Sequence, residues 1–237
     1  MLIIKTGTVR TALDDADGDF EDWFARGLGR PVEVCSVFEG EELPAADATG
    51  GVVVTGSAAM VSYRESWAER TAAWLRDAVS EGVPVLGVCF GHQLLADALG
   101  GRVGPNPRGR EIGTIGVDLV EGAAGDPLLG GLPARIEVHA THLESVLELP
   151  PSAELLGSSE LDPHQAFRIP GRPAWGLQFH PEFSAAVTRA YIEAKREDMQ
   201  EEGMDPERLL GEVRDTRWGG DILTRFAKLA DDATGSA

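Results

Sequence analysis

Two hydrophobic patterns alternate along the first half of the chain. Short apolar runs rich in β-branched residues, typical of β-strands, occupy residues 2–5, 32–38, 50–57 and 83–88. Longer stretches with apolar side chains at helical spacing occupy residues 18–29, 64–82 and 92–101, and glycine closes each of them. Alternating strands and helices predict an α/β protein with a parallel sheet covered by helices on both faces.

The pattern changes after Gly101. Closely spaced short strands with few helices between them are expected at residues 111–120, 134–142, 144–149, 153–159, 164–170 and 173–180. This spacing favours antiparallel strands added to the same sheet. Helical spacing then returns at residues 184–203, 205–213 and 219–232. A chain of 237 residues without repeats or a low-complexity linker suits a single domain, with a core over about residues 1–200 and a C-terminal helical extension over about 201–232.

Composition excludes several classes of partner. The chain has 21 Lys and Arg against 39 Asp and Glu, a formal net charge of -18, which disfavours nucleic acid and anionic membranes. No apolar run approaches the ~18 residues of a membrane span, and the N-terminal stretch MLIIKTG lacks the long apolar core of a signal peptide. Two cysteines fit a reducing compartment, so a cytoplasmic protein is expected. No Cys or His pair has the spacing of metal ligands, so no metal is expected.

The stretch GVCFGHQLL places Cys89 between two glycines, directly after a strand and directly before a helix. This is the nucleophile-elbow pattern with Cys in place of Ser. Gly87 and Gly91 stand where side chains would clash, and the positive end of the helix favours the thiolate. The backbone N–H of Phe90 would then face the oxyanion of an attacked carbonyl.

A buried structural cysteine is the alternative interpretation of Cys89. Cys35 provides the contrast within the same chain. It lies inside a predicted strand, with no glycine turn and no helix start beside it. We therefore expect Cys35 to be a core residue.

A thiolate that attacks an amide needs a base, and the base needs an orienting group. The chain offers the histidines His92, His139, His142, His164 and His180. Only His180, in GLQFHPEF, has an acid at a useful spacing. Glu182 can reach back to its imidazole, and Pro181 holds the bend between them. Taken alone, the tripeptide HPE at residues 180–182 is also typical of a surface turn.

The chain resembles the class I (triad) glutamine amidotransferases over roughly residues 2–190. The resemblance depends on two motifs together, GVCFGHQLL and GLQFHPEF, in which the histidine follows 91 residues after the cysteine. The stretches LIIKTG, GDFEDWF, TGSAAMV and HQAF are similar to stand-alone proteins that resemble the glutaminase part of GMP synthase. The resemblance implies a flavodoxin-like three-layer α/β fold with a mainly parallel sheet. It also implies release of ammonia from the side-chain amide of glutamine, without any cofactor.

The resemblance also implies roles for individual residues. Cys89 matches the nucleophile, His180 the base and Glu182 its partner. Gly56, in the TGS loop, matches the second oxyanion donor beside Phe90. The remaining substrate contacts are expected from Gln93, Ser57, His142 and Leu143. One departure is Ala58, where many relatives have a proline that stiffens the oxyanion loop.

Three functions remain open at this point. The chain has no Gly-rich phosphate loop of the kind that an ATP-pyrophosphatase domain carries, so ammonia used in synthesis would pass to a separate synthase subunit. The same triad would serve a γ-glutamyl peptidase if the pocket admitted a substituted amide. A non-catalytic binding or regulatory module is the alternative of a different class.

Overall fold

A nine-stranded mixed sheet forms the centre of the computed structural model, which describes residues 1–9 and 18–235. Across the sheet the order is β2 (Glu33–Ser36), β1 (Leu2–Lys5), β3 (Val52–Val54), β4 (Val85–Val88), β11 (Ala174–Leu177), β10 (Ala166–Ile169), β9 (Glu154–Ser158), β6 (Glu111–Leu119) and β7 (Arg135–His142). In this spatial order, the neighbouring strands β2, β1, β3, β4 and β11 pair in parallel. The neighbouring strands β11, β10, β9, β6 and β7 pair antiparallel. The predicted parallel first half and antiparallel second half are both confirmed.

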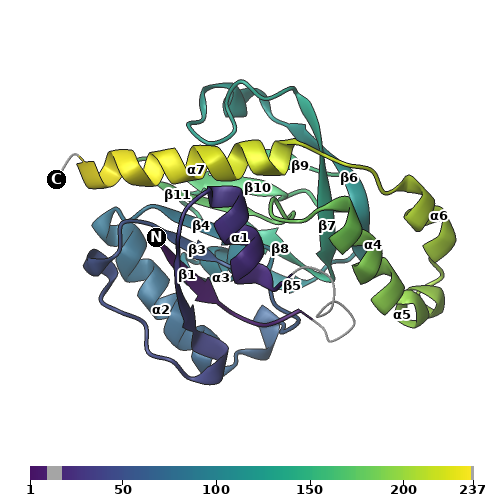
Figure 1. Ribbon diagram of the computed structural model, residues 1–237, viewed down its shortest axis with the longest axis horizontal. Coiled ribbons are helices and arrows are strands. Elements are labelled where there is room, and N and C mark those ends of the chain that lie inside the picture. Colours follow the sequence, from purple (N-terminus) through teal and green to yellow (C-terminus); the bar gives the residue numbers. More distant parts are fainter. Residues whose placement is uncertain (10–17, 236–237) are drawn as a thin grey trace.

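Helices cover both faces of the parallel strands. Residues that alternate along these strands belong to two separate cores, with Ile3 and Val53 in one and Ile4 and Val54 in the other. The first core includes α1 (Phe20–Leu28) and α7 (Trp218–Gly235), and the second includes α2 (Ser66–Glu81) and α3 (Phe90–Ala98). Figure 1 shows α7 crossing above α1, and the two helices are in contact. The expected flavodoxin-like three-layer arrangement is confirmed.

The start of α1 is fixed by its capping residue. Asp19 accepts hydrogen bonds from the backbone N–H groups of Phe20 (2.7 Å) and Val9 (3.0 Å), and Asp22 closes a capping box. Lys5, at the end of β1, forms an ion pair with Asp19 at 2.8 Å. These contacts place Phe20 at the carboxyl edge of the sheet.

Two expectations about the second half are wrong. The segment around residues 144–149 forms β8 (Glu144–Glu148), which leaves the main sheet and pairs with β5 (Arg102–Pro105) in a two-stranded sheet. The sequence pattern predicts no strand at β5, which is short and contains Gly and Pro. The segment at 173–180 forms β11, which is antiparallel to β10 on one side only; on its other side it pairs in parallel with β4, at the buried centre of the sheet.

The helix expected over residues 184–203 is divided into α4 (Ala185–Ala194) and α5 (Arg196–Glu201). Lys195 forms the break, with φ −109° and ψ 14°. No glycine or proline lies at this position, so the sequence pattern gives no sign of it. The break turns the chain beside the carboxyl edge of the sheet.

The C-terminal helices are α6 (Pro206–Glu212) and α7, and α7 is packed tightly onto the rest of the fold. Leu223 and Phe226 are fully buried. A Cβ at Gly27 of α1 would overlap the side chain of Leu223, and a Cβ at Gly219 would overlap the carbonyl oxygen of Pro181. Short 3-10 helices complete the fold at η2 (Val37–Glu39), η3 (Ala46–Ala48), η4 (Val61–Tyr63) and η5 (Glu121–Gly125).

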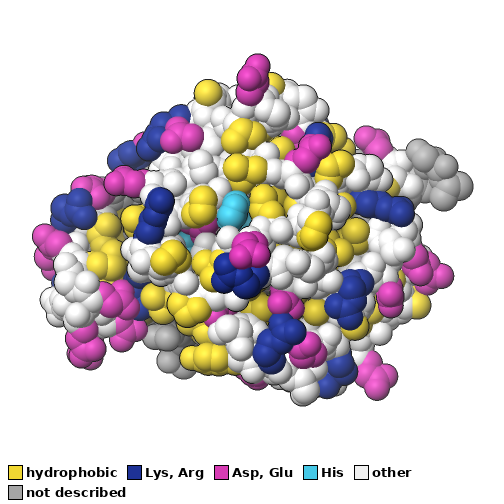
Figure 2. All heavy atoms as spheres, turned by 180° about the vertical axis from the view of Figure 1, so that it is seen from behind, with side chains coloured by type: hydrophobic (Ala, Val, Ile, Leu, Met, Phe, Trp, Pro, Cys, Tyr) yellow, Lys and Arg dark blue, Asp and Glu magenta, His cyan; other side chains and the backbone are white. Residues whose placement is uncertain are grey.

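The surface is mixed in character. Figure 2 shows acidic, basic and apolar side chains interspersed over the face opposite to that of Figure 1. Within residues 1–9 and 18–235, no helix combines the length and the apolar character needed to cross a lipid bilayer.

Candidate active site

Cys89 lies on a strained turn between β4 and α3. Its backbone has φ 52° and ψ −106°, a conformation that a non-glycine residue rarely adopts. Added side chains at Gly87 and Gly91 would overlap the carbonyl oxygens of Gly91 and Val54, respectively. The nucleophile elbow expected from the sequence is therefore present, and both glycines are required by close backbone approach.

Cys35 occupies a different environment. It is buried in the second core, and its thiol donates a weak hydrogen bond to the carbonyl of Glu42 at 3.6 Å. Burial, with a smaller effect of the Glu41 charge, raises the pKa of the Cys35 thiol above its ordinary value. Its expected place in the core is confirmed.

His180 follows β11 and is held on several sides. Its backbone N–H donates to the carbonyl of His139 at 2.8 Å. Its Nδ1 lies 2.7 Å from Oε1 of Glu182, and both side chains are at most 2% exposed. The ring of Phe183 stacks on the imidazole with centroids 3.9 Å apart. The contact between the Glu182 carboxylate and the His180 imidazole, expected from the sequence, is confirmed.

Electrostatics favours a protonated His180. Burial alone lowers the pKa of this imidazole, but its interactions with the Glu182 carboxylate and the Cys89 side chain outweigh burial and raise the pKa to about 10. The neighbouring His139 shows the opposite shift: burial and the positive charge of His180 lower the pKa of the His139 imidazole to about 4. Nε2 of His180 has no oxygen or nitrogen partner among the residues that the structure describes. It is therefore available for proton transfer.

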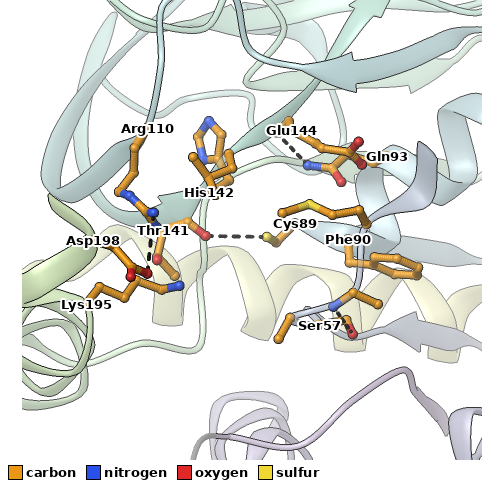
Figure 3. A pocket seen from close by; sticks show the side chains of 14 residues that line it. Ser57, Cys89, Phe90, Gln93, Arg110, Thr141, His142, Glu144, Lys195 and Asp198 are labelled. Atoms are coloured by element: carbon orange, nitrogen blue, oxygen red, sulfur yellow. Dashed lines mark hydrogen bonds and ion pairs between the residues drawn. The ribbon is translucent and has the colours of Figure 1, made fainter. Parts of the chain in front are cut away.

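Two hollows meet at Cys89. The first, about 120 Å³, extends toward Gln93 and Glu144, and the second, about 50 Å³, extends toward His180 and Phe20. The residues common to both are Ser57, Ala58, Cys89, Thr141 and Lys195. Figure 3 shows the first hollow, with Cys89 between Phe90 on one side and Thr141 on the other. The Cys89 thiol contacts the Thr141 carbonyl at 3.8 Å.

The oxyanion loop follows β3. Gly56 packs against the base, since a Cβ there would lie 2.8 Å from Cε1 of His180. Ser57 lines both hollows and Gly56 lines neither. Ser57 Oγ donates to the Thr6 carbonyl at 2.8 Å and accepts from the Ala59 N–H at 3.1 Å. These bonds hold the loop, which has Ala58 and not proline after Ser57.

Gln93 lies one turn into α3, at the wall of the first hollow. Its Nε2 donates to the Glu144 carbonyl at 2.8 Å and to Oε1 of Gln178 at 3.0 Å. With both donors of the amide used in this way, its carbonyl oxygen remains as the acceptor for a ligand.

His142, Leu143 and Glu144 also line the first hollow, and Glu144 lies next to Gln93. Nε2 of His142 lies 3.3 Å from Oδ2 of Asp162 and 3.4 Å from Oε2 of Glu111. The ring therefore contacts two buried carboxylates at once. Glu144 is 3% exposed, and its Oε1 has no hydrogen-bond partner among the residues described. An unpaired buried carboxylate oxygen at a cavity wall is suited to a cationic ligand group.

The other histidines lie away from the cysteine. His92 is buried against Phe167, outside both hollows, and burial lowers its pKa to about 3. Nδ1 of His164 lies 2.6 Å from the carbonyl of Val146.

The sequence patterns assign no role to three residues that line the first hollow: Arg110, Lys195 and Asp198. Thr141 and Glu144, which flank the predicted contacts His142 and Leu143 in the stretch THLESV, line it as well. Lys195 lies inside a predicted helix, and no local pattern marks it.

Comparison with known proteins agrees with this geometry. Residues 25–197 match the family described as glutamine amidotransferase class-I. A glutamine-hydrolyzing GMP synthase subunit of Pyrococcus abyssi is 33% identical over 150 residues, which cover 63% of this chain and 62% of that protein. The glutamine-hydrolyzing GMP synthase of Aeropyrum pernix is 38% identical over 175 residues, 69% of this chain and 32% of that protein. The chain thus spans less than two thirds of these relatives.

Solved structures share the fold over nearly the whole chain. A glutamine amido transferase from Methylobacillus flagellatus has a TM-score of 0.78 at 27% identity, covering 96% of this chain and 94% of that one. A glutamine amidotransferase from Thermotoga maritima has a TM-score of 0.77 at 23% identity, covering 98% of each chain, and supports the fold alone. Because the family match spans the elbow and the His180–Glu182 pair, the chain belongs to the class I glutamine amidotransferase family.

Proposed function

We propose that this chain hydrolyses the side-chain amide of glutamine, with Cys89 as nucleophile, His180 as acid and base, and Glu182 as its partner. One observation carries the proposal. A strained cysteine at the start of a helix shares a hollow with a buried His–Glu pair whose imidazole is held protonated. A thiolate beside an imidazolium is the resting state that thiol acyl transfer requires.

In the first half-reaction, the Cys89 sulfur attacks the amide carbon of the substrate. The imidazolium then acts as general acid, and Nε2 of His180 gives its proton to the departing nitrogen. The C–N bond breaks, ammonia leaves, and a γ-glutamyl thioester remains on Cys89. In the second half-reaction, neutral His180 removes a proton from water as the water attacks the thioester. Glutamate leaves, and the ion pair is restored.

The oxyanion would be held by two backbone N–H groups. Phe90 supplies the first, because it is the opening residue of α3 directly after the nucleophile. The second comes from the loop at Gly56 and Ser57. Gly56 is the position that the sequence motif favours. Ser57 lines both hollows, so its N–H is a second candidate for this role.

The glutamyl part of the substrate would occupy the first hollow. The carbonyl oxygen of Gln93 would accept a hydrogen bond from a donor group on this glutamyl part. Glu144, with its unpaired Oε1, would bind the α-ammonium group. His142 and Leu143 would form the wall, with His142 acting through its contacts to Asp162 and Glu111.

We further propose that the ammonia serves a separate synthase subunit. Support comes from relatives in Pyrococcus abyssi and Thermococcus kodakarensis that are named as glutamine-hydrolyzing subunits of GMP synthase. The non-catalytic alternative has no observation in its favour, because the cysteine, histidine and glutamate are all present and joined in one site.

The test is ammonia release from glutamine by the purified chain, with and without substitution of each cysteine. Cys89→Ser should abolish release, and Cys35→Ser should retain it, because Cys35 lies in the other core. Retained activity in Cys89→Ser would refute the assignment. Release that requires an added synthase subunit would support the coupling proposal.

A further inference from the structure

The second hollow is larger than the hydrolysis of glutamine requires. His180 gives its proton to the leaving nitrogen, so the leaving group must lie on the His180 side of Cys89. For glutamine that group is ammonia, which needs room for about one water-sized molecule. The hollow beside His180 measures about 50 Å³, and a single water needs about 10–15 Å³ on this scale, so there is room for about three to five waters.

The walls of this hollow suit a small organic group. Phe20 and Tyr191 bring aromatic rings, Thr8 and Ser57 bring hydroxyl groups, and Cys89 and His180 line it as well. Phe20 is fixed by the capped start of α1 and stacks toward His180, with ring centroids 6.4 Å apart. The space is therefore bounded by side chains that are already held in place.

Lys195 lines both hollows at their junction. It forms the break between α4 and α5, and its backbone N–H donates to the carbonyl of Tyr191 at 3.1 Å. Figure 3 shows its ammonium end directed toward the side of the cavity on which Cys89 lies. Arg110 also lines the first hollow, but among the described residues Lys195 is the cation that borders the second. Its position therefore suits contact with a substrate from the leaving-group side.

We propose that the hollow beside His180 is a subsite for an amino acid leaving group, and that Lys195 binds its carboxylate. The substrates are γ-glutamyl dipeptides with a small second residue, such as γ-glutamylglycine. This inference rests on the proposed function, because the glutamyl half occupies the first hollow as glutamine does. The Cys89 sulfur bonds to the γ-carbonyl carbon, the C–N bond breaks, and His180 protonates the amine of the departing amino acid. Water then cleaves the thioester and releases glutamate.

The experiment compares three substrates of the same enzyme: glutamine, γ-glutamylethylamide and γ-glutamylglycine. The last two have leaving groups of similar size, and only one carries a carboxylate. We expect cleavage of both, with the higher kcat/KM for γ-glutamylglycine. In Lys195→Met, kcat/KM for γ-glutamylglycine should fall about tenfold or more, while that for γ-glutamylethylamide changes by less than about threefold. Lys195→Arg should restore most of the preference.

Lys228→Met is the matched control, because Lys228 is exposed on α7 outside both hollows. It should leave all three substrates unchanged. Turnover of glutamine without cleavage of either substituted amide overturns this inference and leaves the proposed function standing. An equal loss for all three substrates in Lys195→Met overturns the assignment of Lys195. Failure to cleave any of the three, glutamine included, refutes the proposed function itself.

Discussion

Nδ1 of His180 lies 2.7 Å from Oε1 of Glu182, and the side chains of both residues are shielded from water. This contact fixes the imidazole and leaves Nε2 as the nitrogen that we propose for proton transfer. It also keeps the ring protonated, because the carboxylate is not screened by solvent. The two effects can be separated by substitution.

His180→Ala should lower turnover by about 10³-fold or more, because both half-reactions lose their proton carrier. Glu182→Gln should be clearly less damaging, since an amide oxygen can still accept the Nδ1 hydrogen bond. Steady-state kinetics with glutamine measures both. His164→Ala is the control, because that ring lies outside both hollows. A loss in His164→Ala equal to that in His180→Ala, with the fold intact, would refute the choice of base.

The stability of the protein should depend on pH through His180. Its pKa is raised from about 6.5 in the unfolded chain to about 10 in the fold. A raised pKa means that the native state binds the proton more tightly, so the contribution is complete below about pH 6.5 and is lost as pH rises through about 10. We expect the free energy of unfolding to fall by at least about 1 kcal/mol between pH 7 and pH 10.

Urea unfolding of the wild type and of His180→Asn at both pH values isolates this contribution from that of other groups. The variant should show a smaller fall than the wild type. Equal falls in the two proteins would mean that His180 is not held protonated by the fold.

Gly219 should be a positioning residue for the catalytic pair. A Cβ there would overlap the carbonyl oxygen of Pro181, the residue between His180 and Glu182. Gly219→Ala should therefore displace this turn, lower kcat by about tenfold or more, and destabilise the fold by about 1–3 kcal/mol. A shift of the pH–rate profile with little change in KM would distinguish misplaced catalytic groups from simple loss of stability.

Gly220→Ala provides the matched control on the same helix. A Cβ at Gly220 meets no atom within 4 Å, and alanine favours helix by up to about 1 kcal/mol over glycine. This variant should be fully active and at least as stable as the wild type. If both alanine variants behaved alike, the proposed link between α7 and the catalytic turn would be wrong.

Ser57→Ala tests the support of the oxyanion loop. The hydroxyl makes two bonds, to the Thr6 carbonyl and from the Ala59 N–H, that hold the loop without proline at position 58. Their loss should lower kcat about tenfold and affect KM less, because the oxyanion exists only in the transition state. The double variant Ser57→Ala/Ala58→Pro should recover part of this loss. An unchanged kcat in Ser57→Ala would show that the loop is held by other contacts.

Sequence patterns predicted the features that are local in the chain. The elbow at Cys89 depends on neighbouring glycines, and the His180–Glu182 contact spans two residues, so both could be read from short stretches. The transfer of β8 to a second sheet with β5, the break at Lys195 and the packing of Gly219 on Pro181 depend on contacts between distant segments. The periodicity of hydrophobic residues along the chain does not indicate such contacts. For the same reason the sequence favoured Gly56 as oxyanion donor, whereas the three-dimensional arrangement places Ser57 at the wall of both hollows.

The central claim is that Cys89 forms a γ-glutamyl thioester. Its most direct test is to mix the chain with glutamine, quench in acid within the first turnover, and locate the added mass by peptide mapping. We expect one glutamyl group on the peptide that contains Cys89, none on the peptide that contains Cys35, and loss of the adduct in Cys89→Ser. Ammonia release with no adduct on Cys89, or an adduct on Cys35, would contradict it.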